Sequence, residues 1–111
     1  MYVRSIARQK LGYFPLSSTE ANRIRRFLLF PGAETSVLDP CSGTGAALVS
    51  VTSGAGAIRS AIELDAFRAE EAAKAVDQSV QGNCFDVNCA VESFSLLLLN
   101  PPLSERFFPY V

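Results

Sequence analysis

The sequence predicts an α/β domain built on a mostly parallel sheet, and three stretches carry this prediction. Residues 36–39, 61–63 and 94–99 are short apolar runs, and they end at Asp39, at Glu63 and before Asn100. Buried parallel strands are apolar along their whole length, and alternation of strands with helices indicates parallel crossovers. Ligands of open α/β sheets bind at the carboxyl ends of the strands. We therefore expect Asp39, Glu63 and Asn100 to lie along one edge of the sheet.

Composition narrows the class of protein. The chain has 111 residues, of which 49% are hydrophobic, and this suits one small domain. We divide it into a basic segment and loop at 1–16 and the domain itself at 17–111. The chain has no histidine, which excludes imidazole metal sites and Ser-His or Cys-His catalysis within it, and we expect no metal. No apolar run approaches the roughly 20 residues of a membrane span, and the three cysteines suggest a reducing, cytoplasmic location.

The first helix is predicted by a capping-box pattern. Ser17-Ser18-Thr19-Glu20 places a hydroxyl at the N-cap and a carboxylate three residues later. An apolar stripe of Ala21, Ile24, Phe27 and Leu28 follows, and Pro31-Gly32 is expected to end the helix.

The first strand leads into a glycine turn. Pro40 stops the strand directly after Asp39, and Gly43 and Gly45 permit a sharp turn. We expect main-chain N–H groups of this turn to approach a ligand at the start of the next helix. Because this helix is rich in β-branched residues and is followed by Gly54 and Gly56, it should last at most about three turns.

The second strand and its helix are expected at residues 57–64 and 66–76. Glu63 follows Gly43 by 20 residues, a spacing that suits an acceptor for ribose hydroxyls, and Asp65 is the expected helix cap. Phe67, Ala72 and Val76 are predicted on the inner face of this helix, and Glu70 and Lys74 are predicted to form an exposed pair.

Together with Asn100-Pro101-Pro102, these motifs resemble the class I S-adenosylmethionine-dependent methyltransferases. The resemblance is to the amino-methylating branch that includes the N6-adenine DNA methyltransferases, with Asp-Pro-x-x-Gly-x-Gly and Asn/Asp-Pro-Pro-aromatic motifs. It implies a three-layer Rossmann-like fold, S-adenosylmethionine as cofactor, and methyl transfer to an exocyclic amine, most naturally adenine N6. It covers only the first half of the family's catalytic domain, so we expect four strands in the order 3-2-1-4, without the later strands.

The resemblance also implies roles for individual residues in cofactor binding. Gly43 and Gly45 would receive the methionine portion, Asp39 its amino group, Glu63 the ribose, and Asn83 the adenine. Phe14 and Pro15 match a segment that lies against the methionine portion, although an aromatic plug on the sheet edge is the alternative. The cofactor set is completed by neighbours of these residues, namely Pro40, Cys41 and Cys84. Phe85 could stack on the adenine or fill the core.

We expect the methyl-transfer reaction to take place at Asn100, Pro101 and Pro102. Methylation of an amine needs acceptors that orient the nitrogen, and the Asn100 side-chain oxygen and the Pro101 carbonyl can supply them. Leu103 stands where the family commonly has an aromatic residue that stacks on a flipped base, so this substrate contact is a departure from the pattern.

The uneven distribution of charge and the leucine strand at the edge of the sheet both suggest binding partners. Residues 1–30 carry six basic residues and one acidic residue, a charge of +5, against −6 for the remainder. Such a basic end could attract nucleic acid, or it could be a solvated helix face. The leucine strand, buried on both faces but at the sheet edge, predicts a homodimer or a partner chain.

Two other functions remain open at this point. One is an inactive, truncated methyltransferase-fold module that acts through protein association. The other is an NAD-binding oxidoreductase fragment, suggested by Gly43-x-Gly45 and Glu63, although Leu48 stands in place of the third glycine.

Overall fold

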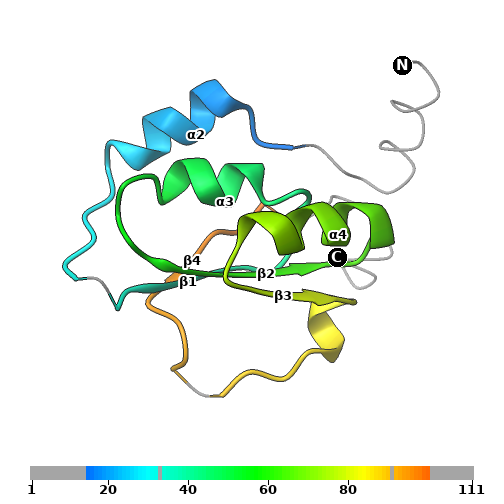
Figure 1. Ribbon diagram of the computed structural model, residues 1–111. Coiled ribbons are helices and arrows are strands. Elements are labelled where there is room, and N and C mark those ends of the chain that lie inside the picture. The colour runs from blue at the N-terminus through cyan, green and yellow to red at the C-terminus, as the bar shows by residue number, and fades with distance from the viewer. Residues whose placement is uncertain (1–14, 33, 91, 101–111) are drawn as a thin grey trace, which may run out of the picture.

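The computed structural model describes residues 15–32, 34–90 and 92–100, and within them helices and strands alternate (Figure 1). The order is α2 (Ser18–Arg25), β1 (Ser36–Asp39), α3 (Ala46–Val51), β2 (Ile58–Glu63), α4 (Ala66–Ala75), β3 (Gln78–Gln81), the 3-10 helix η1 (Cys84–Asp86) and β4 (Leu96–Leu97). Phe14, Pro101, Pro102 and Leu103 lie outside the described residues.

The four strands form one parallel sheet in the order β3-β2-β1-β4, which confirms the predicted fold class and topology. In the register, Asp39 is opposite Ala61 of β2, and Leu38 is opposite Leu97 of β4. Parallel strands present their carboxyl ends at the same edge of a sheet. The residues that follow β1, β2 and β4 are therefore brought to one edge, as the sequence predicted.

Helices α2, α3 and α4 lie on the same side of the sheet in Figure 1. Crossovers between parallel strands are right-handed. The connections β1-α3-β2 and β2-α4-β3 step in the same direction across the sheet. Both helices, α3 and α4, therefore lie on one face. Helix α4 packs against β2 and β3, and α2 packs against α3. The opposite side is crossed by residues 82–90, which contain η1, and by residues 92–95.

The core lies between the sheet and these helices. Its centre is formed by Val37, Leu48, Ala61 and Ala72, all at most 2% exposed. Partly buried side chains surround this centre, and they are Phe30, Ala57, Val76, Leu96 and Leu98. The core therefore joins β1, β2, α3 and α4, the elements whose ends carry Asp39, the glycine turn and Glu63.

Helix α2 begins as predicted but ends early. The Ser17 side chain accepts a hydrogen bond from the Glu20 N–H at 3.2 Å, which confirms the predicted N-cap. The helix ends at Arg25 because the N–H groups of Phe27 and Leu28 bond the carbonyls three residues earlier, which tightens the last turn. The predicted apolar stripe is therefore wrong at Phe27, whose side chain is 87% exposed.

Helix α4 confirms its predicted cap and corrects its predicted faces. The Asp65 side chain accepts from the Arg68 N–H at 2.9 Å. Phe67 is 63% exposed rather than internal, because five residues place it about 140° around the helix from the buried Ala72. Lys74 contacts Glu71 at 3.3 Å instead of the predicted Glu70.

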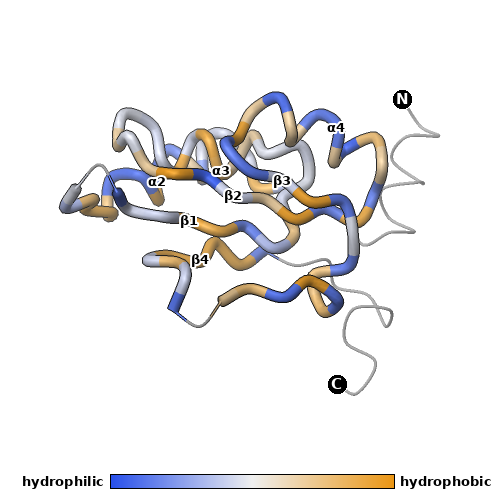
Figure 2. The backbone as a smooth tube through the Cα atoms, turned by 60° about the horizontal axis from the view of Figure 1, so that its bottom comes forward, coloured by the Kyte–Doolittle hydropathy of each residue, from blue (hydrophilic) through white to orange (hydrophobic). Residues whose placement is uncertain are grey.

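Strand β4 is shorter and more exposed than the predicted leucine strand. Leu96 and Leu98 pack against the core, whereas Leu97 and Leu99 are 51% and 65% exposed. Successive strand residues face opposite sides, and the helices lie on one side only. Figure 2 turns the other side toward the viewer and shows apolar colouring on β4 and on much of β1. The prediction that the leucine strand is buried on both faces is therefore wrong.

Candidate active site

A pocket lies at the carboxyl edge of the sheet, between the ends of β1 and β4. It brings together four of the predicted site residues, Pro15, Asp39, Cys41 and Asn100. The other residues that line it are Leu16, Ser42, Thr44, Ala46, Ala47 and Leu98. Because β1 and β4 are neighbours and parallel, the residues after each strand face a common space. The convergence of Asp39 and Asn100 follows directly from the strand order.

Asp39 is the buried acid of this pocket. Its side chain is 3% exposed, and its Oδ1 accepts a hydrogen bond from the Cys41 N–H at 3.1 Å. Burial raises the pKa of Asp39 from its ordinary 3.8 to about 6; the Cys41 hydrogen bond opposes this rise and the nearby Glu63 charge adds to it. Asp39 is therefore mostly ionised at neutral pH, and a bound cation would stabilise its charge.

The glycine turn after β1 is held by the protein itself. Gly43 and Gly45 have φ values of +57° and +84°, a region that side chains disfavour, so this turn needs both glycines. The Gly43 N–H donates to Glu63 Oε1 at 2.8 Å, and the Gly45 N–H donates to the Ser42 carbonyl at 3.0 Å. The expectation that these N–H groups reach out to a ligand is therefore corrected. The Cβ position of Gly45 faces α4, 3.5 Å from the Ala72 Cα, so this glycine allows the turn to pack closely on that helix.

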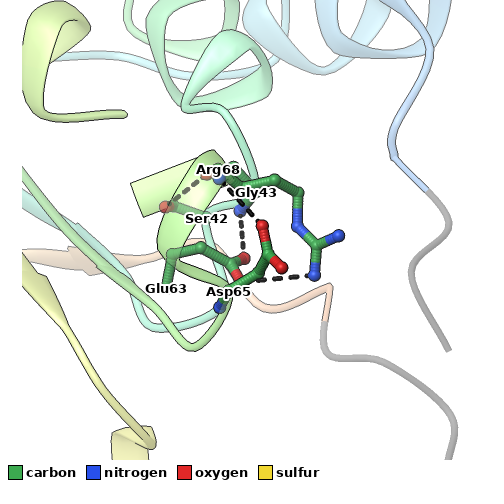
Figure 3. Close-up of polar contacts among 5 residues, drawn as sticks. All are labelled: Ser42, Gly43, Glu63, Asp65 and Arg68. Atoms are coloured by element: carbon green, nitrogen blue, oxygen red, sulfur yellow. Dashed lines mark hydrogen bonds and ion pairs between the residues drawn. The ribbon is translucent and has the colours of Figure 1, made fainter. Parts of the chain in front are cut away.

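Glu63 links the glycine turn to α4 (Figure 3). Its Oε1 accepts from the Gly43 N–H, and its Oε2 accepts from the Asp65 N–H at 2.8 Å and contacts Arg68 Nη2 at 3.4 Å. The residue is only 6% exposed. A carboxylate has about four acceptor positions, so at most one remains for a further donor.

The residues after β3 are arranged mainly by local contacts. Asn83 Oδ1 accepts from the Phe85 N–H at 3.0 Å and so caps η1. Phe85 is 66% exposed, which rules out the core as its location. Cys84 is half-buried and begins η1.

Several predicted residues lie along the same edge but outside the lining of the pocket. They are Pro40, Gly43, Gly45, Glu63, Asn83 and Cys84. Sequence reasoning missed several residues that the structure places here, among them Thr44 in the pocket and Arg68 beside Glu63. A signal for Arg68 was present, since it lies in the first turn of the helix that follows the acidic strand end.

Arg25, in the described part of the basic region, is bonded to the rest of the fold. Arg25 donates through Nε to the Ser53 carbonyl at 2.8 Å and lies 5.0 Å from the centre of the Phe30 ring. Arg23 forms an exposed contact with Glu20 at 3.8 Å. Arg4, Arg8 and Lys10 lie outside the described residues.

Within residues 15–32, 34–90 and 92–100, no helix is both long and apolar enough to cross a bilayer. In the same ranges, no three His, Cys, Asp or Glu side chains are grouped so that they could hold a metal ion.

The chain matches a known protein family. A search of curated proteins finds no significant relative. The model of a family described as an uncharacterised methyltransferase family (DUF6094) matches residues 1–106, nearly the whole chain. Because this match covers far more than half of its length, the chain belongs to this methyltransferase family.

Proposed function

We propose that the protein binds S-adenosylmethionine at the carboxyl edge of the sheet and transfers a methyl group to an exocyclic amine, with adenine N6 in nucleic acid as the preferred acceptor. One observation carries the proposal: Asp39 and Asn100, from the ends of adjacent parallel strands, line the same pocket. Membership of a methyltransferase family supports it. When bound, the cofactor would supply an electrophilic methyl group on a sulfonium.

The donor set of the pocket fits the amino-acid end of this cofactor. The buried Asp39 carboxylate would accept from the α-amino group, since a charged hydrogen bond in a partly dry site is stronger than one in water. The methionine chain would lie against Pro15 and the backbone of Gly43 and Gly45. Pro40 and Cys41 would hold the Asp39 side of the pocket in place.

Glu63 and Asn83 would bind the nucleoside. Glu63 can accept both ribose hydroxyls only if its 3.4 Å contact with Arg68 opens, because its oxygens already accept two backbone hydrogen bonds. Asn83 has a second lone pair on Oδ1 for the adenine amino group. Phe85, exposed next to it, would stack on the adenine ring.

Asn100 would orient the acceptor amine. Its amide oxygen can accept a hydrogen bond from the amine and so point the nitrogen lone pair toward the methyl group, which needs positioning rather than a strong base. Pro101 and Pro102 follow it in the motif, and Leu103 would pack against the substrate. The basic N-terminal residues would attract the phosphates of a nucleic acid.

A second candidate function is an inactive methyltransferase-fold module that acts through association. The exposure of Leu97 and Leu99 favours it, because exposed apolar residues on an edge strand favour pairing with another chain. In this proposal a second copy of the chain, or a partner, covers β4. The three free cysteines suit a reducing, cytoplasmic setting for either function.

Calorimetry with S-adenosylhomocysteine tests cofactor binding without turnover. We expect binding by the native chain, a loss of about tenfold or more in Asp39→Asn, and no change in Glu70→Gln, an exposed acid on α4. A response to NAD with none to S-adenosylhomocysteine would overturn the proposal in favour of the oxidoreductase alternative.

Transfer of a radiolabelled methyl group to DNA, RNA and protein pools identifies the acceptor. Label in DNA or RNA supports the preferred acceptor, and label in protein alone contradicts it. Cofactor binding without any transfer would establish the inactive module.

A further inference from the structure

A second cavity, of about 290 Å³, lies on the side of the sheet opposite to the helices, the side that Figure 2 turns toward the viewer. One wall of this far-face cavity is formed by β1, β2 and β3, and the other by residues of the segments 82–90 and 92–95. The described residues that line it carry no charge, and its apolar lining includes Leu38, Ile62, Val80, Val87 and Phe94. Native interiors leave few voids larger than a water molecule. A cavity of this size is therefore expected to have an occupant.

Apolar surface continues from the far-face cavity to β4. Leu97 of β4 is opposite Leu38 in the parallel register, so both side chains face the same side of the sheet. Leu97 is half exposed, and so is Val80 on β3, at the other side of the cavity. The incompletely covered apolar surface thus extends from β4 to β3, with the cavity between these strands.

The chain that follows β4 has a composition that suits this surface. Residues 101–111 lie outside the described residues, and within them 107–111 read Phe-Phe-Pro-Tyr-Val, without a charged side chain. The charged residues of the segment, Glu105 and Arg106, come directly before this apolar run. Aromatic side chains bury about 150–250 Å² each, so three of them within four residues strongly favour an apolar site. An uncharged cavity lined by aliphatic and aromatic side chains is such a site.

The segment is long enough to reach the cavity from the end of β4. The Leu98 N–H donates to the Leu38 carbonyl at 2.9 Å, so the chain leaves β4 beside a residue that lines the cavity. An extended chain of seven residues, the separation between Asn100 and Phe107, spans about 23–25 Å. Neighbouring strands are about 4.8 Å apart, so β2 lies only about 10 Å from β4 across the sheet. The reach therefore exceeds the distance to be covered.

We propose that residues 107–111 dock in the far-face cavity, with Phe107 and Phe108 packed against its apolar lining. The chain itself then covers the side of the sheet that the helices leave open. Because the segment is tethered to β4, its effective concentration at the cavity is in the millimolar range, whereas a second copy or a small uncharged ligand must come from solution. The tether is what favours this occupant.

The first experiment locates the segment by a disulfide to Cys89, which lines the cavity and is exposed to reagents. Mild oxidation of the Phe108→Cys chain should join the introduced thiol to Cys89 within one chain, since a disulfide needs Cα atoms within about 7 Å of each other. Tryptic digestion should then yield peptides 75–106 and 107–111 as one joined species. Cys89→Ser in the same chain should abolish it. Joining only between chains would overturn the proposal in favour of a second copy.

The second experiment measures how well the segment protects the cavity in a chain without an added cysteine. Replacing both aromatic residues, in Phe107→Ser/Phe108→Ser, should raise the rate of Cys89 alkylation by N-ethylmaleimide about fivefold or more, because the thiol loses its cover. Glu105→Gln, in the charged part of the segment, should leave the rate unchanged. An unchanged rate in the double variant, together with no joined peptide, would overturn the proposal. If all three cysteines react faster, the double variant has lost its fold, and the cross-link decides.

Docking also bears on the candidate active site, because the segment begins directly after Asn100, a residue of the edge pocket. With residues 107–111 docked, the Asn100-Pro101-Pro102 motif is held on one side by β4 and on the other by the cavity. This consequence rests on the proposed function, whereas docking does not.

Phe107→Ser/Phe108→Ser should therefore lower methyl transfer about fivefold or more, because the acceptor amine is positioned less well. Its affinity for S-adenosylhomocysteine in calorimetry should equal that of the native chain. Unchanged transfer would overturn the link to the active site. Absence of S-adenosylhomocysteine binding by the native chain would refute the proposed function, and the cross-link to Cys89 would still decide on docking.

Discussion

The buried Asp39 is expected to destabilise the folded protein at neutral pH, and Asp39→Asn should reverse this. The pKa of Asp39 is about 6 in the folded chain and 3.8 in its ordinary state. At one pKa unit per 1.36 kcal/mol, ionising the folded carboxyl costs at most about 3 kcal/mol relative to the unfolded chain. Asparagine is neutral and of similar shape, and its oxygen can still accept from the Cys41 N–H. The variant should therefore gain up to about 3 kcal/mol at pH 7.5.

The upward direction of the Asp39 pKa shift determines how the stability of the protein depends on pH. Because the folded state binds this proton more tightly, the contribution of Asp39 to stability is fully present below 3.8 and is lost as pH rises through its folded pKa of about 6. The stability difference between variant and native chain should thus be near zero at about pH 4 and increase toward pH 7.5. Urea unfolding at several pH values measures it. Glu70→Gln, an exposed substitution, should show no such increase.

Two results would refute this reasoning. One is a stability difference that does not change with pH, and the other is an Asp39→Asn chain that is less stable than the native chain at pH 7.5. In the expected case the variant is more stable and binds S-adenosylhomocysteine less well. That combination would mark Asp39 as a residue whose cost to folding is balanced by its role in binding.

Three further predictions concern Glu63, Asn100 and Leu97. Glu63→Gln should lower the free energy of unfolding by about 1–3 kcal/mol. Each carboxylate oxygen of Glu63 accepts a hydrogen bond from a backbone N–H, and in glutamine an NH2 group would replace one of these oxygens and face an N–H donor. Thermal melting measures this loss, and an unchanged melting temperature would contradict it. Asn100→Ala should reduce methyl transfer while leaving S-adenosylhomocysteine affinity unchanged in calorimetry, and a parallel loss of both would place Asn100 in cofactor binding instead. If β4 pairs with a second copy, light scattering should show a dimer for the native chain and a monomer for Leu97→Lys, and a native chain that is monomeric at every concentration would exclude the pairing.

The fold was predictable because its determinants are local in the sequence. Asp39 and Glu63 each end a short apolar run, and Ser17 and Asp65 are N-caps whose partners lie three residues ahead. The strand order 3-2-1-4 was predicted from the resemblance to the class I methyltransferases, and the sheet has this order.

The rest could not be predicted because it depends on contacts between distant residues. The Gly43 N–H faces a ligand in the sequence pattern, but in the fold the Glu63 side chain, 20 residues away, takes it. The exposure of Phe67 depends on which side of α4 meets the sheet.

A single carboxylate, that of Glu63, is bonded at once to the turn after β1, to the residue that caps α4, and to a side chain in the first turn of that helix. Any ligand that draws this group away must loosen the start of α4. Occupancy of the pocket edge would thus be transmitted to a helix on the covered face of the sheet. Amide hydrogen exchange at Asp65 and Arg68 should quicken when the nucleoside binds, and unchanged exchange there would mean that Glu63 keeps its present partners.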